Sequence, residues 1–171
     1  MKLKCIRLYL VVAVIAFSSG LQLMAQMQPA KRIAPKVIKG VTLKASTHDV
    51  WAYISSPGDF YASIEEVKDL KCSGNKQGAQ ISFSIPGDKR RVQEISVLDN
   101  QERIMVYYIT QSDYYNQPLV YRILVGRDED NAYVQFEGIF STGDATQDKK
   151  IEKLIISEWM LMQNNLEKKF N

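Results

Sequence analysis

The stretch DKKIEKLIISEWMLMQNNLEKKF, from Asp148 to Phe170, decides the fold. Its apolar residues recur at steps of three or four, as Ile151, Ile155, Trp159, Met162, Leu166 and Phe170. At about 100° per residue these side chains form one apolar stripe along a helix. About 23 residues at about 1.5 Å each give a length of roughly 34 Å. Such a helix can cover one face of a small domain, so we expect the preceding chain to supply a sheet.

The N-terminus has the pattern of a secretory signal. Lys2, Lys4 and Arg7 accompany an apolar run from Ile6 to Phe17. This run is shorter than the roughly 20 residues that cross a bilayer, which favours a cleaved signal over an uncleaved anchor.

The predicted boundaries follow from this signal. Residues 1–25 are expected to be the signal peptide, cleaved after Ala25, with cleavage after Gly20 as the alternative. Residues 26–35 are expected to be a flexible lead-in, and residues 36–171 the folded domain. The mature protein is therefore expected to be secreted or periplasmic, without stable membrane insertion.

The positive charge of the chain belongs to its leader. The sequence has 22 basic and 19 acidic side chains, and residues 1–25 hold three of the basic ones and no acidic one. The mature chain is therefore balanced, which removes the electrostatic case for binding nucleic acid or an anionic membrane.

The residues that usually carry metal or nucleophilic chemistry are scarce. Cys5 lies in the leader, so the mature chain has Cys72 alone and no internal disulfide. Cys72 is expected to be a small buried hydrophobe. A single histidine, His48, argues against a multi-histidine metal site and a Ser-His-Asp set. We therefore predict no metal, no cofactor and no catalytic constellation.

The first third of the mature chain predicts one strand followed by two short helices. Val37–Lys44 alternates as a strand. Ser46 is expected to cap a helix whose third position is Asp49, and the helix ends at Ser56-Pro57-Gly58. A second short helix or turn is expected over Asp59–Glu66.

A period of two begins at Val67 and predicts a run of strands. The clearest strand has Ile81, Phe83 and Ile85 on one side. Ile95 and Val97 are expected to face inward, and Lys89-Arg90-Arg91 to form a solvated edge. The further strands are expected over Arg90–Leu98, Ile104–Thr110, Pro118–Val125 and Ala132–Phe140.

This order predicts an α+β fold. A curved antiparallel sheet of about seven strands would carry two short helices after strand one, and the long C-terminal helix would cover its dry face. A cystatin-like cone is disfavoured because its main helix comes early. A lipocalin barrel is disfavoured by the helices after the first strand.

A series of short motifs runs through the mature chain in a fixed order. They are Ala45-Ser46 with Asp49-Val50-Trp51, Gly58-Asp59-Phe60, Gly78-Ala79, Gly87-Asp88, Val92 with Glu94, Leu98-Asp99, Arg103 with Tyr107, and Phe136 with Gly138 and Phe140. In order and spacing they resemble the START-like or Bet v 1-like helix-grip superfamily, and within it the polyketide cyclase/dehydrase-type branch. The resemblance implies a cavity for an apolar or aromatic small molecule between sheet and helix. Ser63 and Phe136 stand where tryptophans are common, so the ligand itself is not implied.

The inward side chains are the candidate ligand contacts. The inward set is Phe83, Ile85, Ile95, Tyr107, Ile109, Tyr121, Ile123, Phe136, Trp159 and Met162. The predicted ligand-binding residues are Phe83, Tyr107, Tyr121, Phe136, Glu158, Trp159 and Met162. The alternative is that these side chains simply pack into a solid core.

Three functions remain open at this stage. The first is an exported, non-catalytic binding protein for a small hydrophobic molecule. The second is a cyclase or dehydratase in which Tyr107, Tyr121 or Glu158 transfers protons. The third is an interaction module that uses Ile156 and Met160, which are expected to be exposed. The loop Tyr114–Pro118 is expected either to contact a ligand or to cover the sheet edge, and the oligomeric state is left open.

Overall fold

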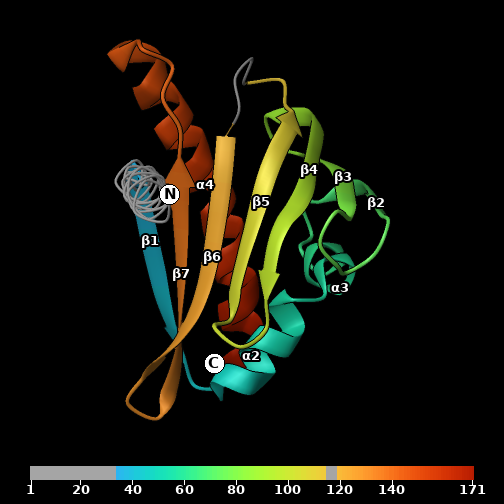
Figure 1. Ribbon diagram of the computed structural model, residues 1–171, viewed down its shortest axis with the longest axis vertical. Coiled ribbons are helices and arrows are strands. Elements are labelled where there is room, and N and C mark those ends of the chain that lie inside the picture. The colour runs from blue at the N-terminus through green and yellow to red at the C-terminus, as the bar shows by residue number, and fades with distance from the viewer. Residues whose placement is uncertain (1–33, 115–118) are drawn as a thin grey trace, which may run out of the picture. The chain divides into compact units, whose positions relative to one another are not determined.

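Seven antiparallel strands form one sheet in the order β1-β7-β6-β5-β4-β3-β2 (Figure 1). The strands are β1 (Val37–Leu43), β2 (Lys68–Cys72), β3 (Gln80–Ile85), β4 (Asp88–Asp99), β5 (Ile104–Gln111), β6 (Leu119–Asp128) and β7 (Asn131–Ile139). The helices α2 (Thr47–Ile54) and α3 (Pro57–Ala62) follow β1, and α4 (Ala145–Phe170) follows β7. This arrangement confirms the predicted helix-grip architecture.

The computed structural model describes residues 34–114 and 119–171, and residues 34–171 form one compact unit. The predicted signal peptide, almost all of the predicted lead-in and residues 115–118 of the predicted loop lie outside the described residues. None of the helices in the described part of the chain is long and apolar enough to cross a membrane.

Local hydrogen bonds fix where the helices begin. Ser46 caps α2 as predicted, since its Oγ accepts a hydrogen bond from the backbone N–H of Asp49 at 3.1 Å. The long helix α4 begins at Ala145, earlier than predicted, because Asp144 caps it. Asp144 Oδ1 accepts from the N–H of Thr146 at 2.7 Å. The shorter α3 starts on Pro57, whose fixed backbone angle suits a first helical turn.

The sheet has a dry face and a wet face, as its alternation predicts. Tyr107 on β5 is fully buried, whereas its neighbour Tyr108 is 39% exposed. The sequence of β5 is apolar on both faces, and the structure shows that the face with Tyr107 is the buried one. On the opposite face from Tyr107, Arg122 Nε donates to Glu137 Oε2 at 2.6 Å. This pair lies on the face away from the inward residues, as expected, although Glu137 itself is buried.

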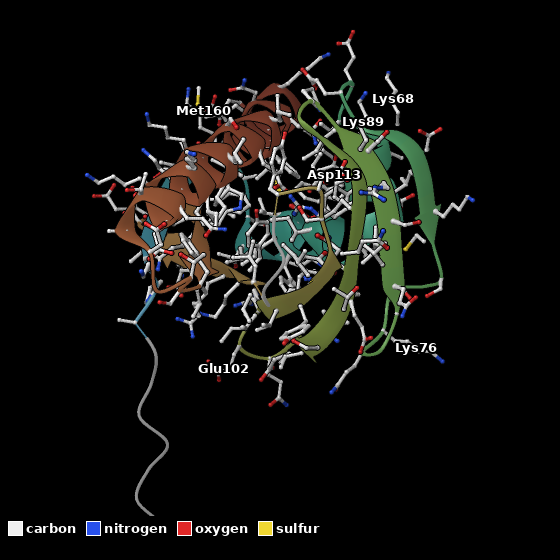
Figure 2. All side chains as sticks on the ribbon, turned by 90° about the horizontal axis from the view of Figure 1, so that it is seen from above. Lys68, Lys76, Lys89, Glu102, Asp113 and Met160 are labelled. Carbon is white, nitrogen blue, oxygen red and sulfur yellow. The ribbon has the colours of Figure 1, made fainter. Side chains whose placement is uncertain are left out.

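Val97, Cys72 and Ile156 lie differently from the predictions. Val97 is 43% exposed rather than inward, because the pairing of β4 with β5 shifts between Ile95 and Val97. Cys72 is exposed rather than buried. Ile156 is partly buried against the core, whereas Met160 is 54% exposed on the side of α4 that faces away from the sheet (Figure 2).

The helix α4 crosses the dry face of the sheet at Gly138 of β7. A β-carbon at this position would lie 3.3 Å from the Trp159 ring and 3.4 Å from Ile155. Trp159 also stacks on Phe136, with ring centroids 5.9 Å apart. The missing side chain of Gly138 therefore permits the close approach of helix and sheet.

The C-terminal half of α4 is tied to the two short helices. Asn165 Nδ2 donates to Tyr53 Oη at 3.1 Å and to Ser63 Oγ at 2.9 Å. Phe170 packs edge-on against Tyr53, with ring centroids 5.7 Å apart. These contacts close one end of the interior, where α2 lies beside the end of α4 (Figure 1).

The crossing at Gly138 can be tested by adding one methyl group. Gly138→Ala is expected to lower the free energy of unfolding by about 1–3 kcal/mol, because the new group overpacks the Trp159 contact. Gly126→Ala is the matched control on β6, since no atom lies within 4 Å of a β-carbon there. Urea unfolding followed by tryptophan fluorescence measures both. Equal stabilities for the two variants would contradict the close crossing.

Candidate functional site

The centre of the candidate site is the guanidinium group of Arg91 on β4. Alternate residues of this strand, Arg91, Gln93 and Ile95, point to the dry face and are buried. Arg91 is only 2% exposed. The predicted solvated edge is therefore correct for Lys89 and Arg90, which are exposed, and wrong for Arg91.

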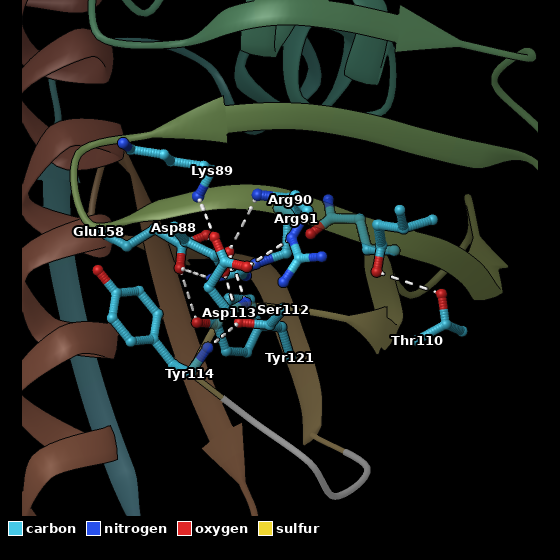
Figure 3. A network of polar contacts seen from close by, with 12 residues as sticks. Asp88, Lys89, Arg90, Arg91, Thr110, Ser112, Asp113, Tyr114, Tyr121 and Glu158 are labelled. Atoms are coloured by element: carbon cyan, nitrogen blue, oxygen red, sulfur yellow. Dashed lines mark hydrogen bonds and ion pairs between the residues drawn. The ribbon is translucent and has the colours of Figure 1, made fainter.

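Two carboxylates from different elements hold this guanidinium group (Figure 3). Arg91 Nε donates to Asp88 Oδ2 at 2.8 Å. Its two terminal nitrogens donate to Glu158 Oε1 at 3.2 Å and to Oε2 at 2.9 Å. Because Glu158 lies on α4, this fork joins the long helix to the start of β4.

Further hydrogen bonds orient both carboxylates. Asp88 accepts from Ser112 Oγ at 2.5 Å and from the backbone N–H of Asp113 at 3.0 Å. Tyr121 Oη donates to Glu158 Oε2 at 2.8 Å, and the Tyr121 ring lies 5.6 Å from the guanidinium carbon. We call the residues Asp88, Arg91, Ser112, Tyr121 and Glu158 the Arg91 network.

The charges of the network support one another. Burial would lower the pKa of Arg91, but Glu158, Tyr121 and Asp88 raise this pKa well above its usual value. Burial would raise the pKa of Asp88, but Arg91 and the hydrogen bonds from Asp113 and Ser112 outweigh it and lower this pKa. A carboxyl group with a lowered pKa in the folded state stabilises the protein at neutral pH, and this contribution is lost as the pH falls through that pKa.

A pocket of about 130 Å³ lies against the network. Its polar wall contains Arg91, Glu158, Ser157 and Tyr114. Its apolar wall consists of Ile85, Pro86, Leu154 and Leu161. We call this space the Arg91 pocket; it lies between α4, the turn from β3 to β4, and the segment that follows β5.

Gly87 shapes the rim of the Arg91 pocket. Its φ of 88° suits the tight turn between β3 and β4, and such an angle favours glycine. A β-carbon at Gly87 would overlap the hydroxyl of Tyr114. The turn therefore lets Tyr114 pack directly over the backbone next to Asp88.

Four of the predicted ligand-binding residues meet beneath the middle of α4. Trp159 stacks on Phe136 and packs edge-on against Tyr121, with ring centroids 5.5 Å apart for the second pair. Tyr121 in turn donates to Glu158. Of these four, Glu158 also lines the Arg91 pocket.

The remaining predicted residues lie elsewhere on the same dry face. Phe83 stacks on Tyr61 of α3 at 4.7 Å, and Tyr107 meets the same ring edge-on at 6.3 Å. Met162 is buried on α4. The aromatic members of the predicted set thus form two groups of packed rings, one around Trp159 and one around Tyr61.

A polar cluster lies inside the group around Tyr61. Gln93 Nε2 donates to Tyr61 Oη at 2.8 Å. Gln93 Oε1 and Tyr107 Oη are both buried and have no hydrogen-bond partner among the described residues. Burial, then Tyr61 and Cys72, raise the pKa of Tyr107 well above its usual value, so its hydroxyl keeps its proton.

Sequence reasoning missed Asp88, Arg91, Gln93 and Tyr61 as members of the site. The available signal was the alternation of β4, because counting back from Ile95 in steps of two reaches Gln93 and Arg91. Within the described segments, no group of three or more His, Cys, Asp or Glu side chains could hold a metal ion.

The unpartnered Tyr107 hydroxyl gives a stability test. Tyr107→Phe is expected to raise the free energy of unfolding by about 1 kcal/mol, since it removes a buried polar group that makes no hydrogen bond. Tyr108→Phe, on the exposed face of the same strand, should change it by less than about 0.5 kcal/mol. Chemical denaturation measures both variants. A loss of stability in Tyr107→Phe would instead reveal a partner for the hydroxyl, such as an internal water.

Comparison with known proteins gives matches at the level of structure. No family model matches the chain, and no curated protein matches its sequence. A protein from Nitrosospira multiformis superposes with a TM-score of 0.65 at 18% identity, over 80% of this chain and 97% of that one. Major latex-like protein 151 from Panax ginseng superposes with a TM-score of 0.61 at 11% identity, over 78% and 95%.

Norcoclaurine synthase from Thalictrum flavum, in complex with dopamine and hydroxybenzaldehyde, is a third match. Its TM-score is 0.62 at 17% identity, over 77% of this chain and 83% of the synthase chain. The low identities establish a shared fold and no more. The chain therefore has the helix-grip fold of the Bet v 1-like proteins.

Proposed function

We propose that the folded domain binds a small, mostly apolar molecule in the Arg91 pocket. The observation that carries this proposal is the composition of the pocket, which joins four apolar side chains to the buried Arg91 and Glu158. Mostly apolar walls with a few convergent polar groups are the usual make-up of a ligand site.

The size of the pocket limits the class of ligand. A cavity of about 150 Å³ in another protein holds one benzene molecule. At about 130 Å³, the Arg91 pocket suits a single ring or a short branched chain. A sterol or a long polyketide would need a larger space than this pocket offers.

The comparisons support the same class of ligand. The matched norcoclaurine synthase structure contains dopamine and hydroxybenzaldehyde, which are single-ring aromatic molecules. A helix-grip fold can therefore hold ligands of this size. The proposal for this chain still rests on its own pocket, because the identity to that protein is 17%.

A polyketide cyclase- or dehydratase-like activity is the second candidate. Its support is the position of Glu158, which lines the pocket and accepts a hydrogen bond from Tyr121. We rank it second because a proton transferred to Glu158 would remove one half of its buried ion pair with Arg91. Release of the bound molecule in chemically unchanged form would favour binding over catalysis.

Filling the pocket tests the binding proposal. Leu154→Trp places a large side chain in the apolar wall and is expected to weaken binding of single-ring compounds at least about tenfold. Met160→Trp on the outer side of the same helix is the matched control and should leave binding unchanged. Native mass spectrometry of the purified protein, followed by calorimetric titration with cationic, neutral and anionic ring compounds, measures the effect. Absence of binding by every compound to the unaltered protein would contradict the proposal.

We propose further that the protein works outside the cytoplasm after residues 1–25 are removed. The support is the basic start and the short apolar run of the leader. Expression of the full chain, followed by cell fractionation and intact-mass measurement, should give an exported protein that begins at Gln26. A cytoplasmic protein that retains residues 1–25 would contradict export.

A further inference from the structure

We propose that the Arg91 pocket selects an amine, whose ammonium group binds at Glu158 while its apolar part lies against Leu154, Leu161 and Ile85. This inference rests on the proposed binding function and adds the charge of the ligand. Its basis is the imbalance of buried charge beside the pocket.

The buried charges do not cancel. Asp88 and Glu158 each contribute one negative charge, and Arg91 contributes one positive charge, so the ion-paired trio has a net charge of −1. The side chains of all three are at most 5% exposed. The nearby pair of Arg90 and Asp113 is neutral. The excess negative charge therefore has little solvent to screen it.

Glu158 has room for another donor. Its Oε2 accepts from both Arg91 and Tyr121, whereas its Oε1 accepts from Arg91 alone among the described residues, at the longer distance of 3.2 Å. A carboxylate oxygen can accept two hydrogen bonds. An ammonium group in the pocket can therefore donate to Oε1 without breaking the Arg91 fork.

The charges around Tyr114, which also lines the Arg91 pocket, affect the pKa of its hydroxyl. Burial raises the pKa of this tyrosine first, and the negative charges of Asp88 and Asp113 raise it further. Arg91 opposes this rise and Glu158 adds to it. Asp88, Asp113 and Glu158 thus act on the Tyr114 hydroxyl in the sense opposite to Arg91.

The surface groove next to the pocket also has a negative net charge. Ile85 and Pro86 line both the Arg91 pocket and a surface groove of about 680 Å³. The charged residues that line this groove are Glu65, Glu66, Asp69, Lys68 and Lys89, which together carry a net charge of −1. An approaching cation is therefore favoured over an anion before it reaches the pocket.

A matched series of ligands tests the inference on the unaltered protein. Benzylamine, benzyl alcohol and benzoate carry one ring each and are cationic, neutral and anionic at neutral pH. We expect benzylamine to bind about tenfold more tightly than benzyl alcohol, because a charge-assisted hydrogen bond is roughly twice as strong as a neutral one. Benzoate should bind most weakly.

Removing one negative charge tests the role of Glu158. Glu158→Gln keeps the shape of the side chain and is expected to reduce the preference for benzylamine over benzyl alcohol to about twofold or less. Circular dichroism must show that the variant is folded, since a broken buried ion pair destabilises proteins. If this variant does not fold, the ligand series on the unaltered protein still tests whether the pocket prefers an amine.

The outcomes separate the two proposals. Binding of benzyl alcohol or benzoate at least as tight as that of benzylamine would overturn the amine inference while supporting the binding function. Failure of all three to bind would overturn the binding function itself. A benzylamine preference that survives in folded Glu158→Gln would overturn the assignment of the ammonium site to Glu158.

Discussion

The arrangement around the pocket depends on the need to pair the buried guanidinium of Arg91. An isolated charge in a protein interior costs several kcal/mol, so the chain must bring partners to it. Asp88 comes from the same strand, Glu158 from α4 and Tyr121 from β6. Correct docking of the long helix thereby becomes a condition for satisfying the charge. One polar group thus fixes the position and rotation of α4 over this part of the sheet.

Packing sets the position of the helix at a second point. Gly138 lets Trp159 and Ile155 approach the sheet, and apolar burial supplies attraction without strict direction. The Arg91 fork supplies direction, because two hydrogen bonds from a planar group tolerate little rotation. The pocket borders the Arg91 contact, where side chains must remain polar, and not the Trp159 contact, where rings fill the space.

The sequence contained most of the fold and part of the site. Apolar alternation at Ile81, Phe83 and Ile85, and the apolar stripe of α4, predict which faces are dry, because burial of apolar surface dominates folding. Arg91 was misplaced for another reason: it belongs to a charged run next to a turn, which is usually solvated, although alternation counted back from Ile95 reaches it. Alternation did misplace Val97, because an irregularity in strand pairing is not encoded by alternation. Residues that depend on partners distant in sequence were thus the ones that sequence reasoning missed.

The interior holds two kinds of polar group that stability alone does not require: a buried ion pair and two buried atoms without hydrogen-bond partners among the described residues. A well-packed apolar substitute for a buried ion pair is often as stable as the pair itself, so stability alone does not require Arg91 and Glu158. Likewise, Tyr107 and Gln93 hold buried atoms without partners among the described residues, which costs stability. Local rules of folding are broken mainly at functional or strained sites. Of the two exceptions, only the Arg91 pair borders the pocket proposed as the ligand site, so the proposed binding function accounts for that pair and not for the Tyr107 hydroxyl.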